Sequence, residues 1–430
     1  MKNKILVFCL DALCSRDLEE MRQMPHFSQV LNQGAQVTSV LPVYPSLTYP
    51  CHVSILTGTY VDKHHLPHNE QVSVFDPNPP WYNQKSDITG KNLLDYAKEH
   101  GYTTASLSWP VSGGANYDYN MPMIVPYSYN GYHPEKWLIG NATDNLMEAY
   151  FWKYGRFIKG RDRSLDLYTM AIAPDLIRDF GQPDVMLIKM CDLDSARHAY
   201  GVSHPLVSEQ LRKHDEEFGV ILETVKRYGD YDNTNFIILG DHGQSDVDHV
   251  LNLNILLRQN GFIKVDEEGK ITDYTAYAHS AALSCWVEVK DPEKDNEKVY
   301  EFLKQIKADP KYGIGYLFTK KEVQEQYHLS GPFEFVLEGD KPISFGNTYL
   351  GDDVFADAVV GDYKTAKASH GSLPFKKETT CFAASGPAFK KGAVLQEGNM
   401  VDEAPTMAKI LGFTMPDVDG RVWDEILKEE

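Results

Sequence analysis

Apolar runs of strand length recur along the first 265 residues, and longer stretches with a single apolar face separate them. Residues 4–10, 183–190 and 235–240 are apolar at nearly every position, which is typical of strands buried on both faces of a sheet. The stretch 205–228 instead shows helical spacing. This alternation predicts an α/β fold with a mostly parallel central sheet flanked by helices.

Two stretches interrupt the alternation. Residues from 113 to about 163 are rich in Tyr, Asn and Gly, which predicts a loop-rich insert. Residues from about 266 to 365 contain short strand-like runs and one amphipathic helix, which predicts a small inserted α+β subdomain. The main, catalytic core would then comprise residues 1–265 and 366–430. A chain of 430 residues is long enough for a large core with an appended unit.

Polar residues follow the three apolar strands directly. Asp11 ends the first, and Asp241 and His242 stand side by side after the third. After the second come Asp194 and His198, four residues apart, so that one helical turn would place both on one face. Open α/β sheets bind their ligands at the carboxyl ends of their strands. We therefore expect these side chains to converge.

His370, late in the chain, adds a third histidine to the three aspartates. Carboxylate and imidazole groups together suit a divalent metal such as Zn²⁺, and this set is large enough for two ions. Each residue alone has an ordinary explanation: Asp11 as a helix cap or turn residue, and His370 as one histidine among 15. Their occurrence together with a hydroxyl motif favours a metal site.

The hydroxyl motif is the segment 44–58. Its residues 53–56 predict a short apolar helix that ends at Gly58, with Pro50 tolerated in the first turn. Thr48 would then lie at or just before a helix N-terminus, where the helix dipole favours an alkoxide and a phosphate. Taken alone, Thr48 fits the role of an ordinary N-cap equally well.

These segments resemble the alkaline phosphatase superfamily and, within it, the nucleotide pyrophosphatase/phosphodiesterase branch. The motifs occur in the order found in that branch, and the resemblance covers both ends and the middle of the chain. The similar segments are Pro45-Ser-Leu-Thr-Tyr-Pro-Cys-His52, Asp194-Ser-Ala-Arg-His198 with Gly201, Asp241-His-Gly243, His370-Gly371 and a closing stretch from Asp402 to Arg421.

The resemblance implies Thr48 as the nucleophile of a two-metal hydrolysis that passes through a phospho-threonine intermediate. It also implies the metal ligands: Asp194, His198 and His370 for one ion, and Asp11, Asp241, His242 and the Thr48 oxygen for the other. Zn²⁺ is the expected metal, with Mn²⁺ as the alternative.

The resemblance further implies substrate contacts. Asn69 stands where the branch keeps an asparagine against the phosphoryl oxygen, a second catalytic role, and Tyr49 where an aromatic ring stacks on a nucleobase. Trp109 belongs to a partial match, because Val111 replaces the glycine of the Trp-Pro-Gly segment. Arg197 replaces another usual glycine, and it would supply charge for a monoester if it pointed into the pocket.

The implied activity is hydrolysis of small phosphodiesters or nucleotide pyrophosphates. A neutral amide such as Asn69 suits a diester, which carries less charge than a monoester. The alternatives are a cytosolic phosphomonoesterase or phosphomutase, or a phosphonate hydrolase, of the same superfamily. A binding protein without activity is disfavoured, since the nucleophile and every ligand are present.

The composition limits the classes of binding partner that we expect. The chain has 42 basic and 61 acidic residues, a formal charge of −19, which argues against long nucleic acid and leaves a small anionic phosphoester as substrate. We expect no membrane span, because no apolar run reaches 18 residues. Six scattered cysteines and a first strand that starts at Lys4, with no signal segment before it, predict a cytoplasmic protein with free thiols.

Overall fold

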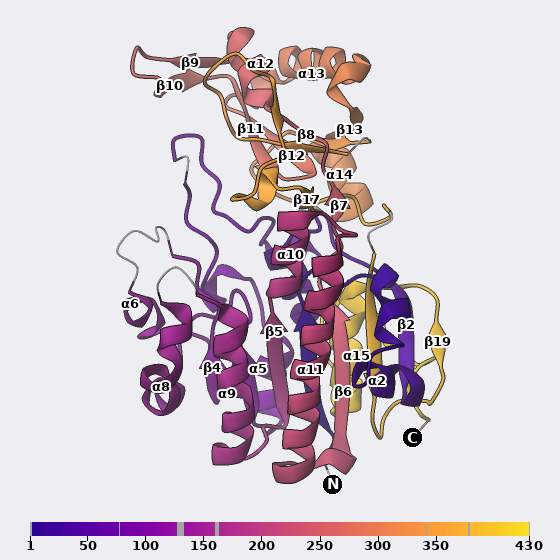
Figure 1. Ribbon diagram of the computed structural model, residues 1–430. Coiled ribbons are helices and arrows are strands. Elements are labelled where there is room, and N and C mark those ends of the chain that lie inside the picture. Colours follow the sequence, from indigo (N-terminus) through magenta and orange to yellow (C-terminus); the bar gives the residue numbers. More distant parts are fainter. Residues whose placement is uncertain are drawn as a thin grey trace.

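A single large sheet forms the centre of the molecule (Figure 1). The computed structural model describes residues 2–76, 78–126, 133–159, 163–340, 342–376 and 379–429. The nine strands run in the order β19-β2-β18-β6-β1-β5-β3-β4, with β20 beside β2. They are β1 (Lys4–Leu10), β2 (Ala35–Leu41), β3 (Thr104–Leu107), β4 (Tyr119–Met121), β5 (Val185–Met190), β6 (Thr234–Gly240), β18 (Thr380–Ser385), β19 (Val394–Leu395) and β20 (Gly398–Asn399).

Most neighbouring strands are parallel, and β18 runs antiparallel to both of its neighbours, β2 and β6. The α/β fold with a mostly parallel sheet that the sequence predicted is therefore confirmed. The three apolar runs correspond to β1, β5 and β6, and the predicted helix 205–228 is α11.

Helices cover both faces of the sheet, which explains why its central strands are apolar throughout. On β1, Ile5, Val7 and Cys9 belong to one apolar core, and the alternate residues between them belong to the other. The first core includes α3 (Thr48–Thr57), α5 (Leu93–Glu99) and α15 (Glu403–Ile410). The second includes α2 (Phe27–Gln33), α9 (Leu165–Phe180), α10 (Asp192–Tyr200) and α11 (Pro205–Tyr228).

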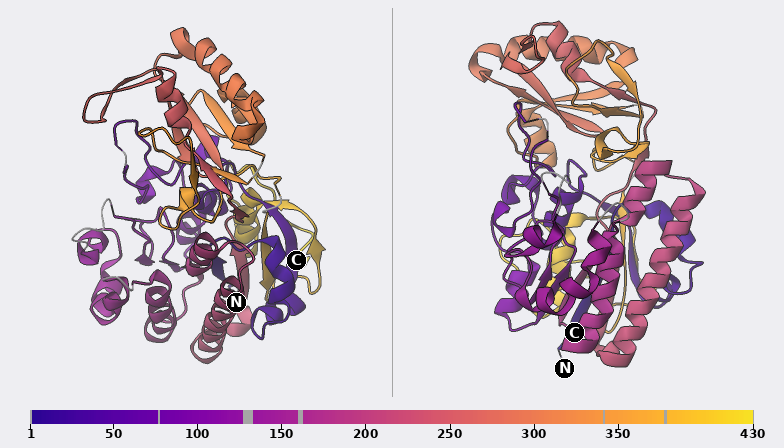
Figure 2. Two further views of the ribbon diagram at one scale, coloured as in Figure 1. Left: turned by 45° about the horizontal axis from the view of Figure 1, so that its top comes forward. Right: turned by 60° about the vertical axis from the view of Figure 1, so that its left-hand side comes forward.

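A smaller unit lies over the carboxyl ends of the central strands, at the top of Figure 1, and Figure 2 shows it from two further sides. Its main sheet has the order β11-β12-β14-β13, and it has an apolar core of its own. Its strands are β8 (His249–Leu251), β9 (Ile263–Val265), β10 (Ile271–Tyr274), β11 (Ala276–Ala281), β12 (Ser284–Val289), β13 (Ile314–Thr319), β14 (Phe335–Gly339), β15 (Ile343–Phe345) and β16 (Phe355–Asp357). Its helices are α12 (Leu253–Gln259), α13 (Pro292–Ala308) and α14 (Lys320–Tyr327).

We propose that this unit is the inserted subdomain. Its packing supports a start at β8, earlier than residue 266, because Leu251 and Leu253 belong to its apolar core. The pairing of β8 with β15 and β16 points to the same boundary.

The described part of the segment 113–163 is more regular than the predicted loop. It contains β4 and a series of short helices: α6 (Pro134–Leu138), α7 (Asp144–Leu146), the π-helical turn Met147–Phe151, α8 (Trp152–Tyr154) and the 3-10 turn Gly155–Ile158. Leu138, Leu146 and Phe151 pack into the same core as α9, so these turns have an apolar surface to fold against. Residues 127–132 and 160–162 of the predicted insert lie outside the described residues.

All six cysteines are free thiols, and five of them are buried. Among the helices in the described part of the chain, none is long and apolar enough to span a bilayer.

Two short strands link the core to the region below the smaller unit. β7 (Ser245–Asp246) pairs with β17 (Ala368–Ser369), so the segments that follow Asp241-His242 and precede His370 lie side by side.

Candidate active site

Thr48 is the first residue of α3, as the sequence predicted. The N-cap position belongs to Leu47, and no side chain makes a capping hydrogen bond there. The helix ends at Gly58, whose φ of 66° is left-handed and suits glycine. The Thr48 hydroxyl is thus not used as a cap, and its Oγ1 lies 3.0 Å from Nε2 of His242.

The register of three adjacent parallel strands brings the aspartates together. Leu10, at the end of β1, pairs with Met190 of β5 on one side and with Gly240 of β6 on the other. The next residues, Asp11 and Asp241, therefore emerge at the same level of the sheet, and α10 begins beside them at Asp192.

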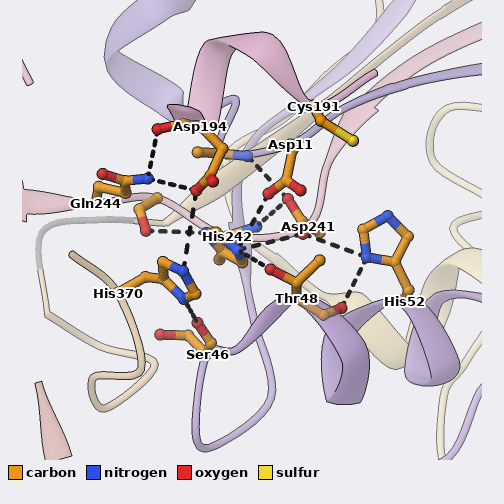
Figure 3. A network of polar contacts seen from close by, with 12 residues as sticks. Asp11, Ser46, Thr48, His52, Cys191, Asp194, Asp241, His242, Gln244 and His370 are labelled. Atoms are coloured by element: carbon orange, nitrogen blue, oxygen red, sulfur yellow. Dashed lines mark hydrogen bonds and ion pairs between the residues drawn. The ribbon is translucent and has the colours of Figure 1, made fainter. Parts of the chain in front are cut away.

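The aspartate and histidine ligands that the resemblance implied converge at this edge. Figure 3 shows five of them: Asp11, Asp194, Asp241, His242 and His370. Ligand atoms of Asp11, Asp241 and His242 lie within 4.8 Å of one another, and so do those of Asp194, His242 and His370. Nε2 of His198 lies 3.2 Å from Oδ1 of Asp194. His242, which the sequence placed in one group, therefore joins both.

Several atoms of the cluster are buried polar groups without a hydrogen bond inside the described part of the chain. They are Oδ1 of Asp11, Oδ2 of Asp241 and Nε2 of His198. A buried polar atom left unpaired costs about 1–3 kcal/mol, and two bound cations, one for the Asp11 and Asp241 oxygens and one for the His198 nitrogen, would satisfy all three. With carboxylate oxygens and imidazole nitrogens as donors, the residues fit two divalent ions.

The histidines are held with one nitrogen facing the cluster. The Nδ1 atoms of His198, His242 and His370 lie 2.7, 3.2 and 3.1 Å from the backbone oxygens of Ala368, Gly243 and Ser46. A hydrogen bond from Nδ1–H fixes the ring and leaves the Nε2 lone pair for a metal.

Burial sets the charge states of these groups. It lowers the pKa of His242, and it lowers that of His370 well below the usual range, so both imidazoles are neutral at pH 7. Burial and then the charge of Asp241 raise the pKa of Asp11. For Asp194, burial raises the pKa, but the nearby His198, His370 and His242 together outweigh burial, and the net shift is downward.

Residues without a predicted role support the ligands. Nε2 of Gln244 donates to Oδ1 of Asp194 at 2.5 Å, and the backbone N–H of Ala12 donates to Oδ1 of Asp241 at 2.9 Å. His52, from the hydroxyl motif, contacts the Thr48 carbonyl at 2.7 Å and lies 3.3 Å from Oδ2 of Asp241. The position of Gln244, directly after the Asp-His-Gly motif, was the sequence signal that could have indicated its supporting role.

Asn69 lies beside the start of α3. Its Oδ1 accepts from the backbone N–H of Tyr49 at 2.9 Å, which orients the amide and directs Nδ2 the other way. The following residue, Glu70, forms a buried ion pair of 2.6 Å with Lys364. This pair ties the Asn69 loop to the segment that leads to His370.

Tyr49 is fully buried, and Trp81 meets it edge to face at 5.2 Å between ring centroids. Because Tyr49 is fully buried, a base could stack on it, as expected from the sequence, only after a neighbouring side chain moved. Trp81 also contacts Tyr363 at 5.8 Å, and Tyr363 stacks on His370 at 5.6 Å and 15°. Sequence reasoning missed Trp81 and Tyr363, because they come from segments far apart in the chain.

Arg197 and Trp109, which the sequence suggested as substrate contacts, are both buried. Arg197 is 1% exposed, pairs with Asp17 at 2.6 Å and also bonds the carbonyl of Ala12. It is rotated about 100° around α10 from His198, so it enters the core behind the ligands. Trp109 is 2% exposed and packs edge-on against His52 at 4.7 Å. Both side chains have structural contacts instead.

A family model described as type I phosphodiesterase / nucleotide pyrophosphatase matches residues 5–372. The chain belongs to this family. It is therefore a hydrolase of the phosphodiesterase and nucleotide pyrophosphatase class, and the phosphomonoesterase, phosphomutase and phosphonate hydrolase alternatives are not favoured.

Individual relatives are distant but cover nearly the whole chain. Bis(5'-adenosyl)-triphosphatase ENPP4 of Bos taurus is 24% identical over 95% of this chain and 78% of its own length. Ectonucleotide pyrophosphatase/phosphodiesterase family member 7 of Homo sapiens is 22% identical over 98% of this chain and 82% of its own.

The fold is shared with solved structures of the family. Murine ectonucleotide pyrophosphatase/phosphodiesterase 5 superimposes with a TM-score of 0.69 at 18% identity, covering 99% of this chain and 100% of that one. An inactive threonine-to-alanine variant of that murine protein, in complex with AMP, gives a TM-score of 0.67 at 19% identity over the same shares of the two chains.

Proposed function

We propose that this chain hydrolyses small phosphodiesters, with nucleotide-type diesters preferred, through a phospho-Thr48 intermediate at a two-metal centre. The observation that carries the proposal is the position of the Thr48 hydroxyl. Its Oγ1 lies 3.0 Å from Nε2 of His242, the residue that belongs to both groups of ligand atoms.

Asp194, His198 and His370 would hold one divalent ion. Asp11, Asp241, His242 and the Thr48 oxygen would hold the second. Mixed imidazole and carboxylate donors favour Zn²⁺ over Mg²⁺, with Mn²⁺ as the alternative. When bound, two such ions supply Lewis-acid chemistry that activates an attacking hydroxyl and stabilises a leaving oxygen.

Thr48 is suited to attack because its hydroxyl is fixed at a helix start and is not used as a cap. Its Oγ1 would form a bond to phosphorus while the bond from phosphorus to the leaving oxygen breaks. Water then cleaves the phospho-threonine and restores the hydroxyl. The positive end of the α3 dipole favours the negative charge that gathers at this position.

Asn69 would stabilise the phosphoryl oxygen. Its Oδ1 is occupied by the backbone N–H of Tyr49, so Nδ2 remains as the donor. An amide adds no formal positive charge, which favours a diester over the more highly charged monoester.

A substrate with a flat group is supported by the aromatic side chains beside the ligands. Trp81 and Tyr363 lie in an edge-to-face pair, and Tyr363 is parallel to the ring of His370. Two relatives support the same kind of substrate. The bovine relative is named for an adenosyl compound, and the murine structure contains AMP.

We also propose a cytoplasmic location. The support is the set of six free thiols, which suits a reducing compartment. Cell fractionation tests it, and recovery of the protein outside the cell would overturn it.

The activity is tested with the metal-loaded chain and two model substrates, bis-p-nitrophenyl phosphate and p-nitrophenyl phosphate. The diester should be hydrolysed faster. A panel of nucleotides, dinucleotides, lipid phosphodiesters and phosphonates then defines the leaving group. Faster turnover of the monoester would contradict the diester preference, and a metal-free chain as active as the loaded one would contradict the two-metal centre.

A further inference from the structure

Lys189 is a charged residue inside an otherwise apolar strand. It lies in β5, all six residues of which are buried, and its side chain is 1% exposed. An ammonium group that is buried without a partner costs several kcal/mol, so a lysine at this place needs a compensating anion.

The compensating anion is Asp11. Nζ of Lys189 lies 2.6 Å from Oδ2 of Asp11, and its other close contacts are the sulfur atoms of Cys191 at 3.1 Å and Met123 at 3.6 Å. The second oxygen of Asp11, Oδ1, lies 3.3 Å from Nε2 of His242. One carboxylate is thus shared between the lysine and the ligand cluster.

This sharing changes the charge of one centre only. The ligand set of Asp11, Asp241 and His242 has two carboxylates, whereas the set of Asp194, His198 and His370 has one. Lys189 offsets one of the two carboxylates. By contrast, Asp194 in the other set accepts from the neutral amide of Gln244, which lies outside the ligand set.

We propose that Lys189 is a built-in counterion of the Asp11 centre: it stabilises the centre without metal and weakens the binding of a divalent ion there. It is a positioning residue that acts through Asp11. A fixed cation beside one oxygen of a ligand carboxylate would repel a divalent ion held by the same carboxylate, because like charges repel. The inference rests on the ligand assignment proposed above.

The test compares zinc binding by the wild-type chain, Lys189→Met and Lys189→Gln, using isothermal titration of chelator-treated protein with zinc chloride. The Asp11→Asn variant identifies the binding step that belongs to the Asp11 centre. In both Lys189 variants this step should become at least tenfold tighter, while the Tm of the metal-free chain falls. Lys189→Gln keeps an N–H donor for Asp11 and is the milder change.

Lys376→Met is the matched control. Lys376 forms an ion pair of the same length, 2.6 Å from the fully buried Glu338, although the Lys376 side chain is itself 27% exposed. Its loss should lower the Tm without changing zinc affinity. If a Lys189 variant folds only when zinc is bound, the inference is supported most strongly. Unchanged or weaker affinity in both variants, or failure of both to fold even with zinc, would overturn the inference. A wild-type chain that binds no zinc would instead overturn the proposed metal centre itself.

Discussion

Oγ1 of Thr48 and Nε2 of His242 are 3.0 Å apart. The same nitrogen lies 3.3 Å from Oδ1 of Asp11 and 3.3 Å from Oδ2 of Asp241. His242 thereby links the hydroxyl of Thr48, at the start of α3, to the carboxylates that follow strands β1 and β6. This contact joins the segment of the proposed nucleophile to the ligand cluster. Substitutions here can therefore be tested separately for their effect on turnover and on stability.

Replacement of Thr48 by alanine should remove turnover while leaving the fold and the metal content nearly unchanged. Thr48 makes no capping hydrogen bond, so the loss in stability should be about 1 kcal/mol or less. Loss of the attacking oxygen should lower kcat by at least about 10³-fold. Steady-state kinetics, urea unfolding and metal analysis together check this.

Thr48→Ser is the control for that variant, since it keeps a hydroxyl at the same position. It should retain measurable turnover and form a trapped phospho-enzyme that mass spectrometry detects. Near-wild-type activity in Thr48→Ala would show that water attacks phosphorus directly.

The convergence of the proposed ligand residues was predictable because each follows a contiguous apolar run or lies in a short motif, and because parallel register must bring strand ends together. The direction of individual side chains was not. Arg197 and His198 are adjacent in sequence, yet helical geometry sends one into the core and the other to the cluster. Lys189 gave a signal, a charge within an apolar strand, but its partner Asp11 is identified only by the pairing of β5 with β1.

The smaller unit shows the same limit. Its strand-like runs were visible, but the pairing of β8 with β15 and β16 was not, because these strands lie about 100 residues later in the chain. The contact between Trp81 and Tyr363 likewise depends on two segments whose approach no local pattern encodes.

Asn69→Ala should slow the hydrolysis of diesters roughly 10²-fold, as expected when an oxyanion donor is lost. The effect should fall mainly on kcat, because Nδ2 would contact the phosphoryl oxygen more strongly in the transition state. The measurement is kcat and KM on bis-p-nitrophenyl phosphate.

Asn69→Asp is the informative companion, since it preserves the acceptor for the Tyr49 N–H and replaces only the donor. It should be as slow as Asn69→Ala on the diester. An active Asn69→Asp enzyme would mean that the residue acts only by positioning Tyr49.

Gln244→Met should weaken zinc binding at the Asp194 centre by about 10- to 100-fold, the usual effect of losing a residue that orients a metal ligand. Nε2 of Gln244 donates to Oδ1 of Asp194 at 2.5 Å and to its carbonyl at 3.2 Å, and methionine fills similar space without a donor. Dialysis against zinc buffers followed by metal analysis measures the change. Equal zinc retention by both chains would assign Gln244 a packing role only.

Glu403 should make the protein less stable as the pH rises. It is the first residue of α15 and fully buried, and neither carboxylate oxygen has a hydrogen-bond partner among the described residues. Burial, followed by the charges of Asp402 and Asp241, raises the pKa of Glu403 well above its usual 4.5. The folded protein therefore favours the protonated acid, whereas the unfolded chain ionises near pH 4.5.

The contribution of Glu403 to the free energy of unfolding is fully present below pH 4.5, and it is lost progressively as the pH rises towards the pKa of Glu403 in the folded state. Glu403→Gln keeps the shape and cannot ionise, so its advantage over the wild type should grow by about 1.4 kcal/mol for each pH unit in that window. Urea unfolding of the metal-free chains at pH 5, 6.5 and 8 measures this, with the exposed Glu397→Gln as the control that leaves the slope unchanged. Parallel pH profiles for the wild type and Glu403→Gln would show that the buried carboxyl has a compensating partner in solution.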